Sequence, residues 1–443
     1  MKASQPSFQA NFFRLAAANV VSNLMVPLAG LVDTAFLGHL SEIRHLAGVA
    51  LATVIFNVVY WSFGFLRMAT TGMTAQARGR AEEDEVWLIA LRSGAIALGL
   101  GLLILLLQGP IRNLGFSLLA AEADVRAAGY DFFNARIWDA PAVLLNLVLL
   151  GWFLGREQGR RVILLSLCGN LSNVVLDYIF VRQLGWGSTG AGLGTALSQY
   201  LMLILGLGLV LQEGGLRQAL RLFPQIWQGQ ALRNLFQLNR DILIRTFALV
   251  ISFALFTNFS SALGTDILAA NTLLLQVVTL AAYFIDGIAF ATESFAGLFY
   301  GSANQKDVDI HSRELESLLR LGGSSSLGLG LAFAFGFALL PGPLFGLLTS
   351  HSAVVAEVNR FVWWLVPCLG LGAIAYLLDG YFLGLTAGRT LRNATVAAAV
   401  LGFLPLALVA QANANPHLLW LALTCFMGAR ALTLVLAVPA TLR

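Results

Sequence analysis

The chain has 443 residues, of which 58% are hydrophobic and only 11% are charged. Soluble globular domains carry about 25% charged residues, so a body of 47.5 kDa with this composition cannot face water on all sides, and a soluble protein is excluded. The net charge of +4 does not indicate nucleic-acid binding, because basic residues gather in the cytoplasmic loops of membrane proteins. We therefore expect a membrane protein with no nucleic-acid partner.

The apolar residues form long continuous runs, such as LLILLL at 102–107. Transmembrane β-strands would alternate apolar and polar residues, so these runs predict helices. A spanning helix needs roughly 20 apolar residues, and the chain has enough of them for twelve helices. We predict an all-α membrane protein with spans near residues 11–38, 46–70, 86–108, 128–154, 162–182, 188–211, 241–263, 267–300, 316–348, 354–385, 393–411 and 417–438.

Arginine and lysine are shared unequally between the loops on the two sides of this arrangement. One set of loops carries 14 of them, and the opposite set carries 4. Because cytoplasmic loops hold the excess of positive charge, we expect both termini to lie in the cytoplasm.

Two internal matches indicate that the chain is built from similar halves. The segment GWFLGREQGR (151–160) matches GYFLGLTAGR (380–389) at six of ten positions, and LAGVAL (46–51) matches LAANTL (268–273) more weakly. Six helices in each half give both halves the same orientation in the membrane. The repeat is therefore parallel, and an axis along the membrane normal relates its two halves. We divide the chain into an N-terminal lobe (1–211), a cytoplasmic linker (212–240) and a C-terminal lobe (241–443), although 212–240 is also consistent with a simple long loop.

The fifth predicted helix carries a stripe of polar residues on an otherwise apolar surface. At about 100° per residue, its members fall on one face, and they are Ser166, Asn170, Asn173 and Asp177. Such a stripe must face protein or water rather than lipid. An aspartate in this setting can hold or release a proton near neutral pH. The alternative is that the stripe only forms hydrogen bonds between helices.

The first predicted helix combines a proline, a glycine and an acid in the run PLAGLVDTAFLGHL. Pro27 removes one backbone hydrogen bond and permits a kink, and Gly30 loosens the helix nearby. A helix that can bend and that carries Asp33 is a plausible switch, with Pro27 as its hinge. The alternative is a passive proline kink.

Three further acids lie in predicted helices of the C-terminal half, and an acid inside the bilayer is a candidate functional group. Asp286 and Glu293 are seven residues apart on one helix, and Asp379 lies in the run YLLDGYFLG. The offsets of the repeat pair Asp286 with Gly64 and Glu293 with Thr71, so the scaffold repeats while the acids do not. The two lobes are therefore expected to have distinct roles.

Several signals of other functions are missing from the sequence. The two lysines, Lys2 and Lys306, lie outside any GxxxxGK[ST] phosphate loop. The five histidines are scattered and predict no metal site, and no nucleophile–base arrangement is present. We therefore expect neither an enzyme nor a bound metal or cofactor.

Five stretches resemble the multidrug and toxic compound extrusion (MATE) family, and in particular its bacterial branch named after DNA-damage-inducible protein F (DinF). They are VPLAGLVDTAFLGHL, FLRMATTGMTAQARG, GNLSNVVLDYIFV, LNRDILIRTFAL and YFIDGIAFATESFAGLFYG. The resemblance runs over nearly the whole chain. It implies twelve helices in two six-helix lobes, a bacterial inner-membrane location, and cation-coupled export of organic compounds.

The same resemblance implies a coupling site in the N-terminal lobe. The matching positions are Asp33, Asn173 and Asp177, which the residue patterns also indicate, and Thr195, which rests on the resemblance alone. Another branch of the family carries an acid in its seventh helix, whereas residues 243–263 contain none. This departure favours protons over sodium ions as the coupled cation.

The expected function is a proton-coupled antiporter that exports small organic substrates by alternating access, as a monomer surrounded by membrane lipids. Apart from the transported H⁺ or Na⁺, no cofactor is expected. A sodium-coupled exporter stays open as an alternative. A lipid-linked precursor flippase is the other alternative, but it would need several cavity arginines to bind phosphate, and arginines inside the predicted helices are few.

Overall fold

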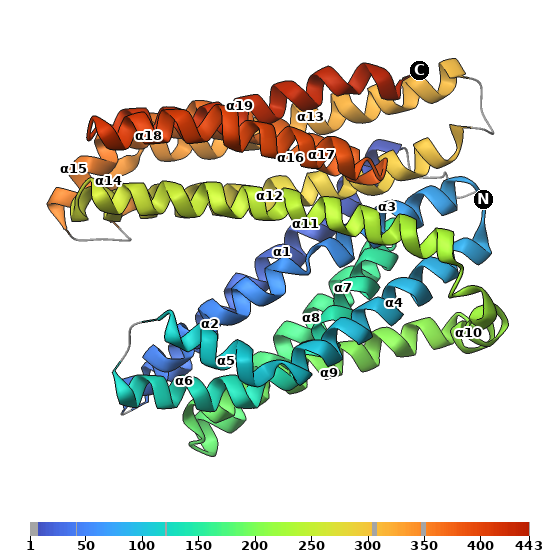
Figure 1. The fold of residues 1–443 in the computed structure, drawn as a ribbon, viewed down its shortest axis with the longest axis horizontal. Helices are drawn as coiled ribbons and strands as arrows, with labels where there is room; N and C mark the ends of the chain where they lie inside the picture. The colour runs from blue at the N-terminus through green and yellow to red at the C-terminus, as the bar shows by residue number, and fades with distance from the viewer. Residues whose placement is uncertain (1–7, 41, 120–121, 304–307, 347–350, 443) are drawn as a thin grey trace. The chain divides into compact units, whose positions relative to one another are not determined.

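The computed structural model describes residues 8–40, 42–119, 122–303, 308–346 and 351–442, and all regular structure within them is helical (Figure 1). Twelve helical segments in this part of the chain are long and apolar enough to cross a membrane. The predicted all-α membrane fold is confirmed. Several of these helical segments are longer than the predicted spans, because polar residues continue the helix at their ends.

The helices of the N-terminal half are α1 (Phe8–Gly38), α2 (Ile43–Ser62), α3 (Phe65–Gly79), α4 (Glu83–Leu106), α5 (Gln108–Ser117), α6 (Ala123–Arg136), α7 (Ala140–Gly155), α8 (Gly159–Asp177), α9 (Gly187–Gln212) and α10 (Gly215–Leu222). Those of the C-terminal half are α11 (Gly229–Ala262), α12 (Thr265–Gly301), α13 (Val308–Leu339), α14 (Pro341–Gly346), α15 (Ser352–Phe361), α16 (Leu365–Gly384), α17 (Gly388–Ala397), α18 (Leu404–Ala412) and α19 (Pro416–Ala437).

These helices form two compact units. The N-terminal unit consists of residues 21–74 and 82–234, and the C-terminal unit consists of residues 235–443 together with the described residues up to Val20 and the segment Ala75–Ala81. Helices α1 and α3 therefore each supply residues to both units. Our division of the chain at residues 211 and 241 stays a prediction.

Within the N-terminal unit, α9 packs against α8 and α6, α2 packs against α6, and α4 packs against α7. Within the C-terminal unit, α12, α13 and α16 are mutual neighbours, and α19 lies along α16 (Figure 1). The core of the C-terminal unit also contains hydrogen bonds. The indole of Trp420 donates to Asn271 over 2.9 Å, and Asn271 donates to Ser260 over 2.8 Å.

The internal repeat appears as the same close approach of two helices in each unit. Gly151 of α7 lies on the backbone of Arg67 in α3, where an added Cβ would be 2.5 Å from the Arg67 carbonyl oxygen. Gly380 of α16 lies on the backbone of Ala289 in α12 in the same way. The two glycines are 229 residues apart, and their two partners are 222 apart, which are the offsets of the sequence matches. Only a residue without a side chain allows this approach.

The predicted linker is mostly helical. Helix α10 covers residues 215–222, and α11 already begins at Gly229, inside the stretch that we expected to be linker. The buried guanidinium of Arg92 donates to the carbonyl oxygens of Gln225 over 3.1 Å and of Ile226 over 3.3 Å. Arg92 also pairs with Glu85 at 2.8 Å. This arginine therefore holds the turn between α10 and α11 against α4.

The residue after α9, Glu213, accepts hydrogen bonds from Arg156 over 2.6 Å and from Arg161. Partial burial alone would raise the pKa of the Glu213 carboxyl, but the hydrogen bonds and charges of the two arginines outweigh it, so the pKa lies below its usual value. The pair of arginines thereby ties the α7–α8 turn to the end of α9.

We predict that Gly380→Ala lowers the free energy of unfolding by about 1–3 kcal/mol, because the new Cβ overlaps the α12 backbone. Gly336→Ala is the matched control, since nothing lies within 4 Å of a Cβ at that position of α13. Its expected effect is neutral or stabilising by at most about 1 kcal/mol. Denaturant unfolding in detergent measures both, and equal effects of the two substitutions would contradict the packing described.

The lowered pKa of Glu213 predicts an acid-dependent contribution to stability. A carboxyl with a depressed pKa in the folded state stabilises the fold above its unfolded pKa, and this contribution is lost as the pH falls through the folded pKa. Wild type should therefore unfold at higher temperature than Glu213→Gln at neutral pH. The difference should shrink below about pH 4. A difference that stays constant into stronger acid would show that the arginines do not act through the carboxylate charge.

Candidate functional site

Two acids from different helices meet in the N-terminal unit. Asp177 is the last residue of α8, directly before a turn of π-helix at Tyr178–Gln183, and only 1% of its surface is exposed. Asp33 lies in the final turns of α1, and its carboxyl is close enough to that of Asp177 for a hydrogen bond and a direct interaction of charges. Short π-helical turns inside α-helices are frequent at functional sites.

The kind of interaction between Asp33 and Asp177 depends on whether their carboxyl groups carry a proton. Neither oxygen of Asp177 has a hydrogen-bond partner among the described residues when the carboxyls are ionised. An ionised carboxyl only accepts hydrogen bonds, whereas a protonated one also donates. A hydrogen bond between Asp33 and Asp177 would therefore require a proton on one of them.

The position of the Asp177 side chain depends on a glycine in the neighbouring helix. Gly194 of α9 faces the carboxyl of Asp177, and an added Cβ would overlap its Oδ1 atom. The run GAGLG (190–194), which contains Gly194, thus allows α9 to approach the acid.

The remaining stripe residues connect α8 to its neighbours. The hydroxyl of Ser166 shares a hydrogen bond with Ser22 of α1, and Asn173 donates to Thr195 of α9 over 3.4 Å. Asn170 donates to the carbonyl oxygen of Ser166 in its own helix over 2.8 Å. The stripe therefore forms hydrogen bonds between helices, as its alternative interpretation requires, and it also contains the acid contact. The role of Thr195 in a coupling site, which the resemblance implies, stays a prediction.

Pro27 lies six residues before Asp33 in α1 and is half-buried. The helix runs through it without interruption from Phe8 to Gly38. A hinge at Pro27 stays a prediction.

A second charged group, which the sequence patterns did not indicate, lies beside the two acids. The fully buried carboxyl of Asp139 accepts a hydrogen bond from the hydroxyl of Tyr60 and lies 3.4 Å from Nε of Arg136. The guanidinium of Arg136 stacks on Phe56 at 4.4 Å, and its charge acts on both Asp33 and Asp177. An arginine and an aspartate three residues apart inside an apolar span were a readable signal of this pair.

The acids of the C-terminal unit have different surroundings. Asp379 accepts hydrogen bonds from Arg245 and Arg430, and all three side chains are buried. The guanidinium of Arg430 also lies 5.5 Å from the centre of the Tyr376 ring. Asp379 is therefore held in a cluster with one net positive charge.

The other two acids of this unit share α12, as their spacing predicts. Glu293 is fully buried. Asp286 is half-buried, and its charge acts on Tyr283 and on Tyr376. The charge of Asp379 also acts on Tyr376. Across the described ranges, no group of three or more histidine, cysteine, aspartate or glutamate side chains could hold a metal ion.

Comparison with known proteins decides the family. The model of the MatE family matches residues 19–179 and 242–408, which is more than half of the chain. This chain belongs to the MATE family. It is therefore a multi-pass membrane protein of a transporter family rather than of an enzyme family, and small molecules are its expected substrates.

Individual relatives support this family assignment, and a solved structure has the same fold. DNA damage-inducible protein F of Escherichia coli (strain K12) is 36% identical over 424 residues, which cover 95% of this chain and 90% of that protein. Protein DETOXIFICATION 44, chloroplastic, of Arabidopsis thaliana is 26% identical over 374 residues, which cover 81% of this chain and 69% of that protein. The structure of a MOP superfamily transporter from Pyrococcus furiosus has the same fold, with a TM-score of 0.82 at 19% identity over 98% of this chain and 96% of that one.

We predict that Gly194→Ala in this MATE transporter moves the Asp177 carboxyl out of contact with Asp33. A side chain can rotate away from the new methyl group, so folding should be nearly normal while export of a fluorescent compound from cells falls at least about tenfold. Gly208→Ala in the same helix is the control, because nothing lies within 4 Å of a Cβ there. Normal export by Gly194→Ala would show that the position of the Asp177 carboxyl does not matter.

Proposed function

We propose that this protein is a proton-driven antiporter that exports organic compounds from the cytoplasm across the bacterial inner membrane. The observation that carries the proposal is the contact between the half-buried Asp33 and the buried Asp177, which lie on two different helices. An ionisable group inside a membrane protein is expensive to keep and is commonly part of an ion pathway.

The chemistry of the contact suits proton binding. Two adjacent carboxylates repel each other, and one proton between them replaces that repulsion with a hydrogen bond, so the two acids titrate as a pair. Arg136 supplies a positive charge beside the pair, and Asp139 with Tyr60 holds its guanidinium in place. The charge that a substrate meets in this site therefore depends on how many protons the pair carries.

Competition between protons and substrate provides the coupling. With both acids ionised, the site offers negative charge and the polar groups of Asn173 and Thr195 to an organic compound. Proton entry from outside neutralises the pair, α1 rearranges around Pro27, and the compound leaves outward. The lobes then turn to the cytoplasm, where the acids lose their protons. Ligands shift such an equilibrium only by binding its two states differently, and the charge change supplies that difference.

Two further observations support the proposed direction of transport and the proposed class of substrate. The excess of arginine in one set of loops predicts that both termini are cytoplasmic. A relative from Acinetobacter baylyi, 27% identical over 282 residues, is named a probable multidrug resistance protein. Organic compounds in the cytoplasm are therefore the proposed substrates.

The alternatives have less support. A sodium ion could bind the oxygens of Asp33, Asp177 and Asn173 in the N-terminal unit. A sodium site around Asp379 in the C-terminal unit has less support, because two arginines already neutralise that carboxylate. A flippase for lipid-linked precursors needs arginines that are open to phosphate. The buried Arg92, Arg245 and Arg430 are each paired with an acid instead.

We expect purified protein in lipid vesicles to drive dye uptake when the vesicle interior is acidic and no sodium gradient is present. Asp33→Asn and Asp177→Asn should each abolish this uptake, because an amide cannot exchange a proton. Asp266→Asn, which changes an exposed acid in the first turn of α12, should leave it unchanged.

Three results would contradict the proposal: full uptake by both amide variants, uptake driven only by a sodium gradient, or scrambling of labelled lipid without dye uptake. Each variant is first checked for its amount in the membrane and its thermal unfolding. A loss of transport then reports on the acid and not on folding.

A further inference from the structure

Helix α10, which follows the spanning helix α9, carries an apolar, a basic and a buried face. At about 100° per residue, these three faces consist, in turn, of Leu216 with Leu220, of Arg217 with Arg221, and of Gly215 with Leu222. The side chain of Leu222 is 1% exposed, whereas that of Leu220 is 71% exposed. The apolar and the basic face are therefore both open to the surroundings of the N-terminal unit.

The open apolar face continues on both sides of α10. In the turn that follows the helix, Phe223 and Trp227 are 61% and 65% exposed. Before it, the last two turns of α9 expose Leu207 and Leu211. Single exposed apolar side chains are common, whereas several together mark an interaction surface. We define the α10 surface as Leu216, Leu220, Phe223 and Trp227.

Ion pairs and hydrogen bonds hold this surface in one position. Arg221 pairs with Asp84 in the first turn of α4. The side chain of Ile226 is buried, and the guanidinium of Arg92 binds the carbonyl oxygens of Ile226 and Gln225. The exposed apolar side chains thus belong to an ordered element, which reduces the entropy cost of binding a partner.

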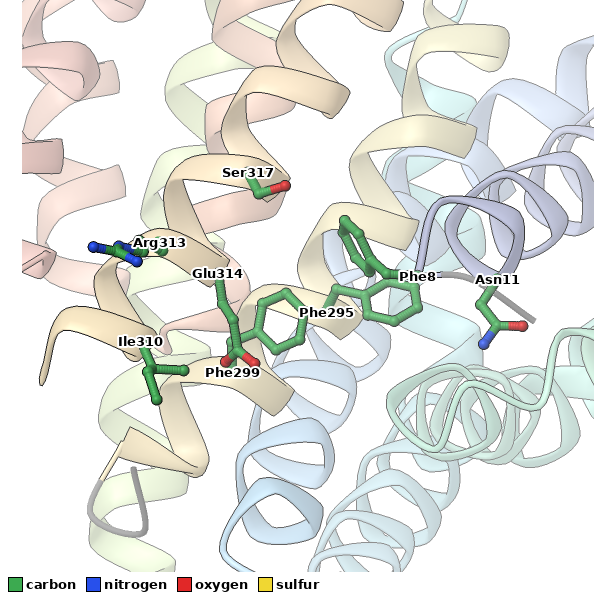
Figure 2. Close-up of a pocket in the computed structure, with 8 residues that line it drawn as sticks. All are labelled: Phe8, Asn11, Phe295, Phe299, Ile310, Arg313, Glu314 and Ser317. Atoms are coloured by element: carbon green, nitrogen blue, oxygen red, sulfur yellow. The ribbon is translucent and has the colours of Figure 1, made fainter. Parts of the chain in front are cut away.

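The α10 surface differs in shape from the cavity of the C-terminal unit. That cavity has a volume of about 590 Å³, and Phe8, Phe295 and Phe299 line one side of it (Figure 2). These rings pack against one another, and Phe295 is buried. On the α10 surface, by contrast, each of the four side chains is more than half exposed. Such a surface suits an extended apolar partner better than a small ligand.

We propose that α10 lies in the membrane–water interface and binds phospholipids of the cytoplasmic leaflet. The α10 surface lies among the upper acyl chains, and Arg217 binds an anionic headgroup. Helices that lie in the interface carry Trp, Phe and Leu on one face and basic residues on another. The arginine distribution of the loops predicts that this end of α9 is cytoplasmic, and the cytoplasmic leaflet is negatively charged.

The two arginines of α10 have different roles in this proposal. Arg221 is engaged by Asp84. Arg217 is exposed and forms no ion pair with any residue that the structure describes, so its charge is available to a lipid phosphate. Neither the direction of transport nor its coupling to protons enters the proposal.

Fluorescence quenching from the two sides of the interface tests the position of α10. The native cysteines Cys168, Cys368 and Cys425 are replaced by alanine, and bimane is attached to Leu220→Cys in purified protein in lipid nanodiscs. Doxyl-labelled phosphatidylglycerol should quench this probe at least about threefold more strongly than bimane at Glu83→Cys, and iodide in the buffer should do the reverse. Glu83 is the matched control, because it is exposed in the first turn of α4, next to the acid that pairs with α10.

The same assay tests the headgroup. At equal mole fraction, doxyl-labelled phosphatidylglycerol should quench bimane at Leu220→Cys about twofold to fivefold more strongly than doxyl-labelled phosphatidylcholine. Arg217→Gln should remove this preference, whereas Arg217→Lys should keep most of it, because the charge is retained. Salt at about 1 M should weaken the preference by screening.

Strong quenching of the Leu220→Cys probe by iodide would show that α10 faces water. Weak quenching by both iodide and lipid would show that a protein or a second copy of this chain covers the surface, and either result overturns the proposal. Equal quenching by the two lipids would overturn the anionic headgroup. Thermal unfolding confirms that each variant is folded. Asp33→Asn should leave all of these results unchanged, so failure of this proposal is distinguishable from failure of the proposed antiport.

Discussion

The proposed activity depends on one contact in the N-terminal unit, between the buried carboxyl of Asp177 and the half-buried carboxyl of Asp33. Two ionised carboxylates at this distance repel, and one proton turns the repulsion into a hydrogen bond. Gly194 makes the contact possible, because any side chain at that position would displace the Asp177 carboxyl. Arg136, held by Asp139, places a fixed positive charge nearby. In the proposed mechanism, the surrounding helices keep a proton-dependent charge at this contact.

The two halves of the chain share their packing but differ in their electrostatics. The repeated glycines Gly151 and Gly380 lie on the backbones of equivalent residues, so helix approach is the same in both units. In the N-terminal unit a pair of acids lies beside one arginine. In the C-terminal unit two arginines surround the single acid Asp379. Hydrogen bonds from the two guanidinium groups to this carboxyl hold their helices together, which suits a structural role.

Charges in the spanning segments are largely balanced locally. Arg92 is paired with Glu85, Arg136 with Asp139, and Arg245 and Arg430 with Asp379. A lone buried charge is costly, and a partner with additional hydrogen bonds offsets that cost. Against this background, the carboxyl pair of the N-terminal unit is unusual because both of its members are acids.

Hydrophobic runs alone determined the twelve helices, because a helix in lipid must satisfy its own backbone and so depends on local sequence. Helical periodicity also placed the stripe from Ser166 to Asp177 on one face. Only the tertiary structure decided which groups meet. Asp33 and Asp177 are 144 residues apart, as are Ser22 and Ser166, and Arg245 reaches Asp379 across 134. Such pairs depend on which helix faces pack together, and close approaches at glycines such as Gly194 set that packing, which no local pattern reveals.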